Sequence, residues 1–417
     1  MVRKNILIVA PYGFVDRLTN YIEFIAARHL VKNEWSVTAI VQSLDTNRSS
    51  TDSVSGIRVF RYGTLLAGAF LFCRYLLSGR PDIVHVHNLR NNRLAFGVAM
   101  VTKYILRRPL VFTEYGLLHD HYLTDDRDNP LEHQIKTDNL IKNVADISRR
   151  LWRAKGRGAI DVLKNYFFHW PLTHADTVVF VSKHNVPIAK MLGLKNILYL
   201  PYFIDTNRWS YSDVDFDDKS KIQHTIASQK LDTLVNTKNV LFIGQLKLRK
   251  GWDVLLRAIP FIPPDVVSRF VFITNSAYEE PDEFASLVNV LKVRSRLLFL
   301  GKVDSKILKR AYETCAVVAV PSHYEGFGLP VLEAFDMGKP VVASAVDAIT
   351  DNVTNEQNGL LVPPGDPKKL AEAITRVFRD ESLYKRLALG GKTTIKQLQS
   401  PENSNAWLDF YNSLLHP

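Results

Sequence analysis

Short apolar runs alternate with segments of helical periodicity along the whole chain. Apolar side chains at helical spacing, as in Leu18–Leu30 and Trp252–Ile259, predict helices between the runs. Apolar strands that alternate with helices are typical of parallel sheets covered on both faces, so the pattern predicts an α/β fold. The runs predict strands at Ile6–Ala10, Ile83–Val86, Leu110–Thr113, Thr177–Val181, Ile197–Leu200, Val240–Ile243, Phe270–Thr274, Leu297–Leu300, Ala316–Val320 and Val341–Ala343.

The length of 417 residues predicts more than one domain, because domains usually contain about 100–200 residues. A stretch rich in Asp and Ser, Ser210–Ser220, lacks helical periodicity and is typical of a surface connector. We therefore expect one domain over residues 1–205 and a second over 206–397. Residues 398–417 contain a last amphipathic helix, in which Trp407 and Tyr411 fall on the apolar side.

Composition indicates a folded globular protein, with 46% hydrophobic and 23% charged residues. No apolar run reaches the roughly 20 residues that span a bilayer, and residues 1–5 lead into the first strand without the pattern of a secretory signal. Cys73 and Cys315 lie in separate apolar stretches and are expected to be buried packing residues, not a disulfide. These features predict a cytoplasmic protein.

The formal net charge of +11 lies entirely in residues 1–210, because residues 211–417 sum to zero. A basic half indicates either an anionic partner, such as a membrane surface, a phosphorylated lipid or nucleic acid, or a basic surface that only aids solubility. No base-reading motif accompanies the charge, so nucleic acid is not expected.

Two segments carry the membrane hypothesis, which would place the protein peripherally at the inner face of the membrane. The apolar run Leu65–Phe72 is followed by Arg74 and Arg80, and it predicts either a core helix, which is favoured, or a membrane contact. A basic cluster surrounds Trp152 and predicts either a solvated face or an anionic-surface site. Its members are Arg149, Arg150, Arg153, Lys155 and Arg157.

The most informative segment follows the strand that ends at Val320. Pro330 suits the first turn of a helix, and the glycines before it let a ligand approach the backbone closely. Helix-start N–H groups with the positive end of the helix dipole form a phosphate site. Glu325 and Glu333 frame this site, and carboxylates accept hydrogen bonds from the hydroxyl pairs of sugars and ribose. The alternative is that neither residue binds a ligand. Glu325 would then be a solvated loop residue, and Glu333 a charge near the helix start that the helix dipole favours.

These residues carry a family likeness. Glu325-x7-Glu333, set in Glu-Gly-Phe-Gly-Leu-Pro, resembles the signature of the retaining glycosyltransferases of family 4, and the likeness continues through 338–344 and 358–362. It implies the GT-B fold, with two Rossmann-like domains facing each other across a cleft and a C-terminal helix that crosses back to the N-terminal domain. It further implies hexosyl transfer from a nucleotide-diphospho-sugar to a glycan or lipid-linked acceptor, as in polysaccharide or glycolipid biosynthesis.

By this resemblance Glu325 contacts the transferred sugar and Glu333 binds the donor ribose. Lys250, at the end of the loop 244–251, would meet the diphosphate. Gln245 stands where the family usually has Arg, so Lys247 or Arg249 substitutes for that cation or the donor site is altered. Backbone groups of the remaining donor-site residues would contact the sugar, diphosphate and base: Phe327, Gly328, Leu329, Gly301 and Lys302.

In the N-terminal half, Gly13 permits a tight turn after the first strand, and His87 ends another strand. The resemblance places both on the acceptor side. Tyr115 stands where many relatives have a His that contacts the donor sugar. Either Tyr115 takes this role itself or His119 or His121, which follow shortly after, takes it over.

The resemblance implies transfer with retention of anomeric configuration, in which the departing phosphate helps to deprotonate the incoming hydroxyl. No metal and no cofactor is expected, because Lys250 and helix-start N–H groups meet the diphosphate charge. Two alternatives remain. Gln245 and Tyr115 are compatible with a catalytically inactive nucleotide-sugar-binding protein. The pairs His85-x-His87 and His119-x-His121 could instead ligate the metal of a hydrolase.

Overall fold

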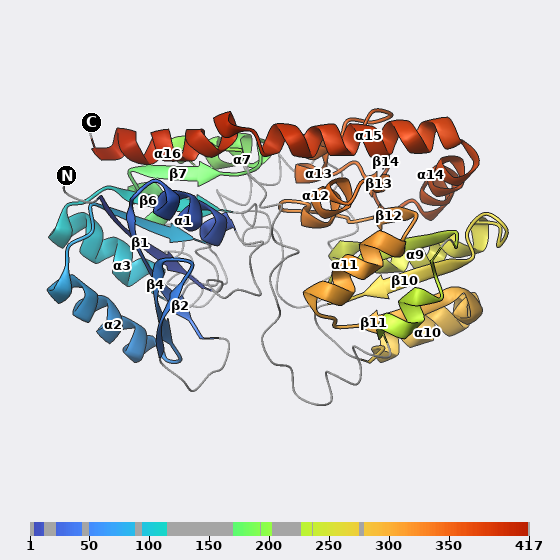
Figure 1. The fold of residues 1–417 in the computed structure, drawn as a ribbon, viewed down its shortest axis with the longest axis horizontal. Coiled ribbons are helices and arrows are strands. Elements are labelled where there is room, and N and C mark those ends of the chain that lie inside the picture. Colours follow the sequence, from blue (N-terminus) through green and yellow to red (C-terminus); the bar gives the residue numbers. More distant parts are fainter. Residues whose placement is uncertain are drawn as a thin grey trace, which may run out of the picture. The chain divides into compact units, whose positions relative to one another are not determined.

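The computed structural model of the chain describes residues 4–11, 22–43, 50–87, 94–114, 170–191, 193–201, 227–235, 237–274 and 279–415. The chain divides into two compact units (Figure 1). The N-terminal unit contains residues 1–205 and 398–417, and the C-terminal unit contains residues 206–397. Each unit is built on a mainly parallel sheet, which confirms the predicted α/β class. The expected connector Ser210–Ser220 lies outside the described residues.

The N-terminal unit contains an eight-stranded sheet with the order β3-β4-β2-β1-β5-β6-β7-β8. All strand pairs are parallel except β3 with β4. The central strand β1 is buried on both faces of the sheet, because α1 covers one face and α2 and α3 cover the other. The strands are β1 (Asn5–Ala10), β2 (Ser36–Gln42), β3 (Ser50–Val54), β4 (Ile57–Tyr62), β5 (Ile83–His87), β6 (Leu110–Glu114), β7 (Thr177–Phe180) and β8 (Ile197–Tyr199).

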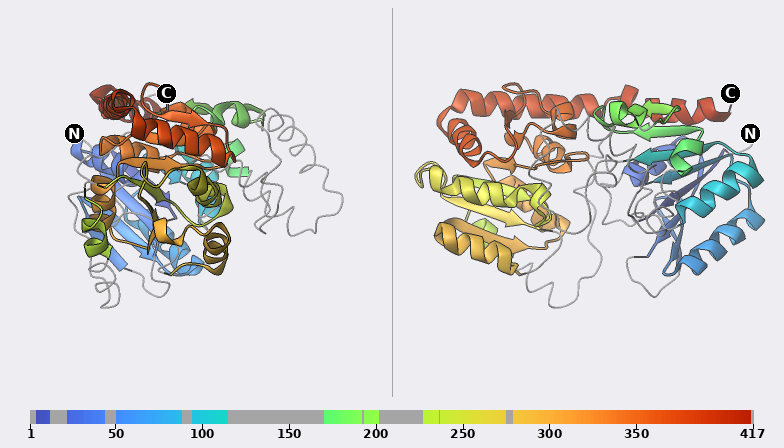
Figure 2. Two further views of the ribbon diagram at one scale, coloured as in Figure 1. Left: turned by 90° about the vertical axis from the view of Figure 1, so that its right-hand side faces the viewer. Right: turned by 180° about the vertical axis from the view of Figure 1, so that it is seen from behind.

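Helices of the N-terminal unit pack on this sheet as the apolar spacing requires. Helix α2 contacts β2 and β4, and residues of α2 and α3 share one hydrophobic cluster with residues of β1, β5 and β6. The view from behind shows α2 and α3 running beside each other (Figure 2, right). The helices of this unit are α1 (Ile22–Lys32), α2 (Leu65–Ser78), α3 (Ala95–Met100), the π-helix η3 (Val101–Leu106), α7 (Asn185–Met191) and α16 (Pro401–Leu415).

The last helix, α16, packs against α1 and β5. Trp407 and Tyr411 are buried on its inner side. The indole nitrogen of Trp407 donates a hydrogen bond of 2.9 Å to the carbonyl of Pro201, and the Tyr411 hydroxyl lies 2.7 Å from Nδ1 of His85. These contacts fix the end of the chain in the N-terminal unit, although its sequence neighbours belong to the other unit.

The C-terminal unit contains a six-stranded parallel sheet with the order β11-β10-β9-β12-β13-β14. In chain order the strands run outward from β9 to one edge, and the chain then returns to β12 and runs to the other edge. The strands are β9 (Asn239–Ile243), β10 (Arg269–Ile273), β11 (Leu297–Gly301), β12 (Val317–Val320), β13 (Val341–Ser344) and β14 (Leu360–Val362).

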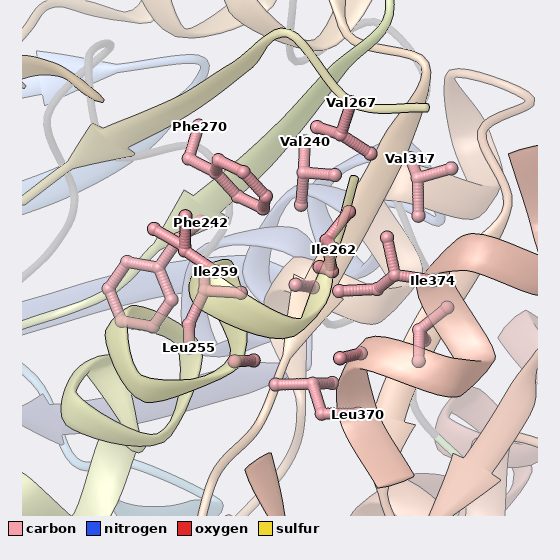
Figure 3. Close-up of a cluster of buried hydrophobic side chains, with 14 of the residues drawn as sticks. Val240, Phe242, Leu255, Ile259, Ile262, Val267, Phe270, Val317, Leu370 and Ile374 are labelled. Atoms are coloured by element: carbon pink, nitrogen blue, oxygen red, sulfur yellow. The ribbon is translucent and has the colours of Figure 1, made fainter. Parts of the chain in front are cut away.

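Apolar residues of the central strands meet those of α9 and α14 in one core (Figure 3). Phe270 and Val240 from the sheet lie with Leu255, Leu370 and Ile374 from the helices in this cluster. The helices are η6 (Leu248–Lys250), α9 (Trp252–Ala258), η7 (Ile259–Phe261), α10 (Asp282–Leu291), η8 (Arg294–Arg296), α11 (Ser305–Thr314), α12 (Leu329–Asp336), α13 (Asp347–Asn352), α14 (Pro367–Arg379) and α15 (Glu381–Leu398).

All ten strands predicted from the apolar runs are present, with ends that shift by one residue or so. Four further strands, β2, β3, β4 and β14, were not predicted. In β4 the exposed Arg58 and the partly exposed Arg61 interrupt the apolar run, and β14 has only three residues. Short or interrupted runs of this kind resemble loops in the sequence, and their pairing partners decide that they become strands.

Candidate functional site

The strand order of the C-terminal sheet creates one point at which ligands of open parallel sheets bind. The strands β9 and β12 are neighbours, but after β9 the chain adds strands toward one edge of the sheet and after β12 toward the other edge. The loops that follow these two strands therefore leave toward opposite faces of the sheet. Such a switch point, beyond the carboxyl ends of the strands, is the usual binding position in doubly wound folds. The loop after β9 contains Lys250, and the loop after β12 contains Glu325. Tertiary structure therefore brings together two residues that the sequence predicted separately.

The loop after β12 ends in a helix start that has an open backbone. Gly328 adopts a left-handed conformation, with φ of 78°, and immediately precedes α12. No side chain caps this helix, and Pro330 lies in its first turn. A left-handed residue at this point favours glycine, and uncapped N–H groups with the helix dipole suit an anionic ligand. Phe327, Gly328 and Leu329, which the sequence predicted as donor contacts, lie at this helix start.

Lys250 and Glu325 form a shielded ion pair. Lys250 Nζ donates to Glu325 Oε2, and the Ser322 hydroxyl donates to the same oxygen at 3.2 Å. The lysine and glutamate side chains are only 14% and 8% exposed. Burial alone would raise the pKa of Glu325, but Lys250, the more distant Arg249 and the Ser322 hydroxyl together hold that pKa below its usual value. Glu325 is consequently ionised at neutral pH and keeps Lys250 oriented.

Close backbone contact locks the two loops together. Gly251 is left-handed, with φ of 67°, and a Cβ there would overlap the carbonyl oxygen of Pro321. The N–H of His323 donates a 2.9 Å hydrogen bond to the carbonyl of Arg249. The Arg249 guanidinium also lies 6.0 Å from the centre of the Tyr324 ring. Only glycine at position 251 lets the loops approach this closely, and their approach creates the ion pair.

Glu333 lies on α12 and is 4% exposed. Its Oε2 accepts a 2.7 Å hydrogen bond from the hydroxyl of Tyr312, a fully buried residue of α11. Asp347 holds the loop after β12, because its carboxylate accepts a 3.2 Å hydrogen bond from the backbone N–H of Glu325. Neither Tyr312 nor Asp347 was predicted from the sequence as part of the site. Each follows from tertiary packing, and no motif around either residue would have indicated it.

The remaining donor-side residues occupy the same carboxyl edge of the sheet. Gln245 is partly buried in the loop after β9, Lys247 is exposed, and the partly buried Arg249 attracts the Glu325 carboxylate. Of the two cations considered as substitutes at Gln245, Arg249 therefore lies nearer to the ion pair. Gly301 ends β11 with φ of 66°, and its carbonyl accepts the N–H of Thr274 at 3.0 Å. Lys302 follows and is exposed.

His87 ends β5 in the N-terminal unit, and its side chain is fully buried in the chain. Burial lowers its pKa to about 3, which keeps the ring neutral. The other acceptor-side and catalytic predictions in this unit lie outside the described residues. They are Gly13, Tyr115, His119, His121 and the basic cluster Arg149, Arg150, Arg153, Lys155 and Arg157.

Both ring nitrogens of the buried His85 have hydrogen-bonding partners within the N-terminal unit. Its Nδ1 lies 2.7 Å from the Tyr411 hydroxyl and its Nε2 lies 2.7 Å from Oγ1 of Thr113. Because both ring nitrogens are occupied, His85 and His87 do not offer the ligand pair that a metal hydrolase would need. Within the described residues, no group of three or more His, Cys, Asp or Glu side chains is placed to hold a metal ion.

The family described as "Glycosyl transferases group 1" matches residues 237–380, the segment that contains both loops. A D-inositol 3-phosphate glycosyltransferase of Xylanimonas cellulosilytica is 28% identical over 82% of this chain and 86% of its own.

Two solved structures share the fold across the whole chain. Sucrose-phosphate synthase from Thermosynechococcus elongatus has a TM-score of 0.73 at 20% identity, covering 99% of both chains. HepE from Anabaena, in complex with UDP-glucose, has a TM-score of 0.66 at 19% identity, covering 98% of this chain and 99% of its own. These structures confirm the predicted two-domain architecture. Residues 237–380 therefore match the group 1 glycosyltransferase family, and the chain as a whole shares the fold of these two solved structures.

Proposed function

We propose that the protein is a retaining hexosyltransferase of family 4 that moves a sugar from a nucleotide-diphospho-sugar to a glycan or lipid-linked acceptor. The observation that carries the proposal is the Lys250–Glu325 pair beside the uncapped start of α12, at the switch point of the sheet. This arrangement offers a cation and backbone N–H groups to a diphosphate, with a carboxylate for sugar hydroxyls.

Each residue then has a defined task. Lys250 and the N–H groups of Gly328 and Leu329 stabilise the negative charge that grows on the leaving diphosphate. Glu325 binds the hydroxyls of the transferred sugar and holds Lys250 in place. Glu333, fixed by Tyr312, binds the ribose hydroxyls. The departing phosphate oxygen takes the proton of the incoming hydroxyl on the same face, so the reaction retains configuration and needs neither a protein nucleophile nor a metal.

An anionic acceptor suits the distribution of charge. The excess of +11 lies in residues 1–210, and one relative is named a D-inositol 3-phosphate glycosyltransferase, after a phosphorylated molecule. We propose that the N-terminal unit binds an acceptor that carries phosphate or lies at an anionic membrane surface, to which the protein associates peripherally. No described helix has the length and hydropathy to cross a bilayer.

A thermal-shift screen with UDP-, GDP- and ADP-sugars tests the proposal and identifies the donor base. The stabilising donor is then incubated with candidate acceptors, and NMR of the product reports the anomeric configuration. Lys250→Gln should lower kcat/KM by about 100-fold or more, since it removes one charged donor to the leaving group. The exposed Lys396→Gln, on α15 of the same unit, serves as the matched control.

Three results would contradict parts of this proposal. A donor that binds without any turnover would identify an inactive nucleotide-sugar-binding protein. An inverted product would refute retention. Complete loss of activity in EDTA, restored by Mg²⁺, would refute metal independence.

A further inference from the structure

Helix α2 is apolar on its outward face as well as on the face that it buries. Leu71 and Tyr75 belong to the core of the N-terminal unit, whereas Leu66, Phe70 and Leu77 are 84%, 66% and 91% exposed. A helix that is apolar all round is normally covered on every side. The sequence favoured a core helix here, and the structure places only one side of it in the core. Cys73, expected to be buried, is exposed on the same outward side.

The neighbouring element continues this apolar surface. Met100 of α3 and Tyr104 and Ile105 of η3 are 36%, 57% and 72% exposed. A Cβ at Gly68 of α2 would meet the Leu94 side chain, which directly precedes α3, so the two elements are in contact. Figures 1 and 2 show them side by side. We call this surface the α2–α3 face; its apolar members are Leu66, Phe70, Leu77, Met100, Tyr104 and Ile105.

Exposure of large apolar side chains is concentrated on this surface. Seven of the eleven exposed large hydrophobic residues in the described part of the chain lie on α2, α3 and η3. Single exposed hydrophobic residues are ordinary, but a contiguous group of them marks a surface that contacts a partner.

The charged residues that the segments of the α2–α3 face contribute all have one sign. Residues 64–80 and 94–109 contain no Asp or Glu. Arg74 lies within the outward stripe of α2, and Arg80, Arg107 and Arg108 follow the ends of α2 and η3, all of them exposed. The strands β4, β5 and β6 that these helices connect all run in the same direction, so the C-terminal ends of α2 and η3 lie at the same end of the sheet. Arg80, Arg107 and Arg108 form a basic rim there. Lys103 is excluded from this rim, because it pairs with Asp176 at 2.5 Å.

We propose that the α2–α3 face docks on the surface of an anionic lipid bilayer. The apolar side chains would enter the boundary between headgroups and acyl chains, and the arginines would meet lipid phosphates. A second copy of this chain fits poorly, since it would bring the same arginines against each other. The inference deepens the membrane association proposed above by naming its surface, and its test requires neither donor nor transfer activity.

Flotation of the full chain with vesicles tests this surface. Wild type should bind vesicles of phosphatidylcholine with phosphatidylglycerol more strongly than vesicles of phosphatidylcholine alone. The apolar variant Leu66→Gln/Phe70→Gln/Leu77→Gln and the charge variant Arg80→Gln/Arg107→Gln/Arg108→Gln should each bind at least about tenfold more weakly. The matched control replaces exposed apolar residues of the C-terminal unit, Val290→Gln/Leu389→Gln, and should bind as wild type does.

Unchanged melting temperatures would show that both variants remain folded, which is expected because the replaced side chains are exposed. Equal vesicle binding by wild type and both variants would overturn the proposal, as would absence of binding by wild type. A wild-type dimer in light scattering that the apolar variant abolishes would assign the face to self-association instead. Donor-induced stabilisation is measured separately, so a failure of the proposed donor site remains distinguishable from a failure of this surface.

Discussion

Replacement of Gly251 by Ala tests whether close contact between the two loops creates the site. The new Cβ would overlap the Pro321 carbonyl oxygen, well inside the 3.0 Å that real Cβ atoms keep. The left-handed backbone, with φ of 67°, adds a second cost, because L-residues other than glycine lose about 1–2 kcal/mol there. Overpacking against the backbone adds about 1–3 kcal/mol.

Together these costs give a loss of about 2–5 kcal/mol in the free energy of unfolding of the C-terminal unit. For a domain of this size the melting temperature should fall by about 4–20 °C. The loops must also move apart, which separates Lys250 from Glu325, so donor affinity should fall as well. Calorimetry of the unfolding transition and titration with the donor identified in the thermal-shift screen measure the two effects.

Gly328→Ala provides the control within the same unit. Gly328 has a similar φ, 78°, but the nearest atom to its added Cβ would be 3.7 Å away, an ordinary contact. This variant should pay only the backbone cost, about 1–2 kcal/mol, or about 2–8 °C in melting temperature. If Gly251→Ala is no less stable than Gly328→Ala, the contact with Pro321 does not hold the loops and the reasoning is wrong.

Three further predictions concern single buried interactions. Lys250→Met leaves the Glu325 carboxylate buried without its cation and should cost about 3–5 kcal/mol, whereas Lys250→Met/Glu325→Leu should recover much of it. Because the folded-state pKa of Glu325 lies below its usual 4.5, the pair stabilises the protein above that pH and the contribution is lost as the pH falls. Urea unfolding at pH 7 and pH 3.5 should show the smaller difference between wild type and Lys250→Met at pH 3.5, and an equal difference would refute the argument. Tyr312→Phe removes a hydrogen bond to the Glu333 carboxylate, so it should cost about 1.5–3 kcal/mol and weaken nucleotide binding; unchanged calorimetric titration would contradict this. Tyr411→Phe removes the contact with His85, so it should lower the free energy of unfolding of the N-terminal unit by about 1 kcal/mol. Donor binding should not change, because the donor site is placed in the other unit, and a loss of donor affinity would contradict that placement.

The apolar pattern was sufficient for the class of fold. Runs such as Val240–Ile243 and Phe270–Thr274 are uninterrupted because central parallel strands are buried on both faces, and that constraint is visible in one dimension. Strands with polar positions or few residues were missed, since β2 carries Thr38, β4 carries Arg58 and the edge strand β14 has three residues. Their sequences are compatible with loops, and only pairing with a neighbouring strand decides their structure.

The candidate site divides in the same way. Gly328, Pro330 and the two glutamates lie within nine residues of each other, so local chemistry alone predicted a helix start suited to phosphate. The pairing of Lys250 with Glu325 joins positions 75 residues apart, and it exists because the strand order makes β9 and β12 neighbours.

The partner of Glu333 and the exposure of α2 also depended on tertiary structure. Tyr312 reaches Glu333 from a different helix, and nothing in the residues around either one specifies the contact. Leu66 and Leu71 are equally apolar in sequence, yet the first is 84% and the second 8% exposed. Sequence periodicity records how apolar each position is, whereas burial depends on what packs against it, and that is fixed only when distant segments meet.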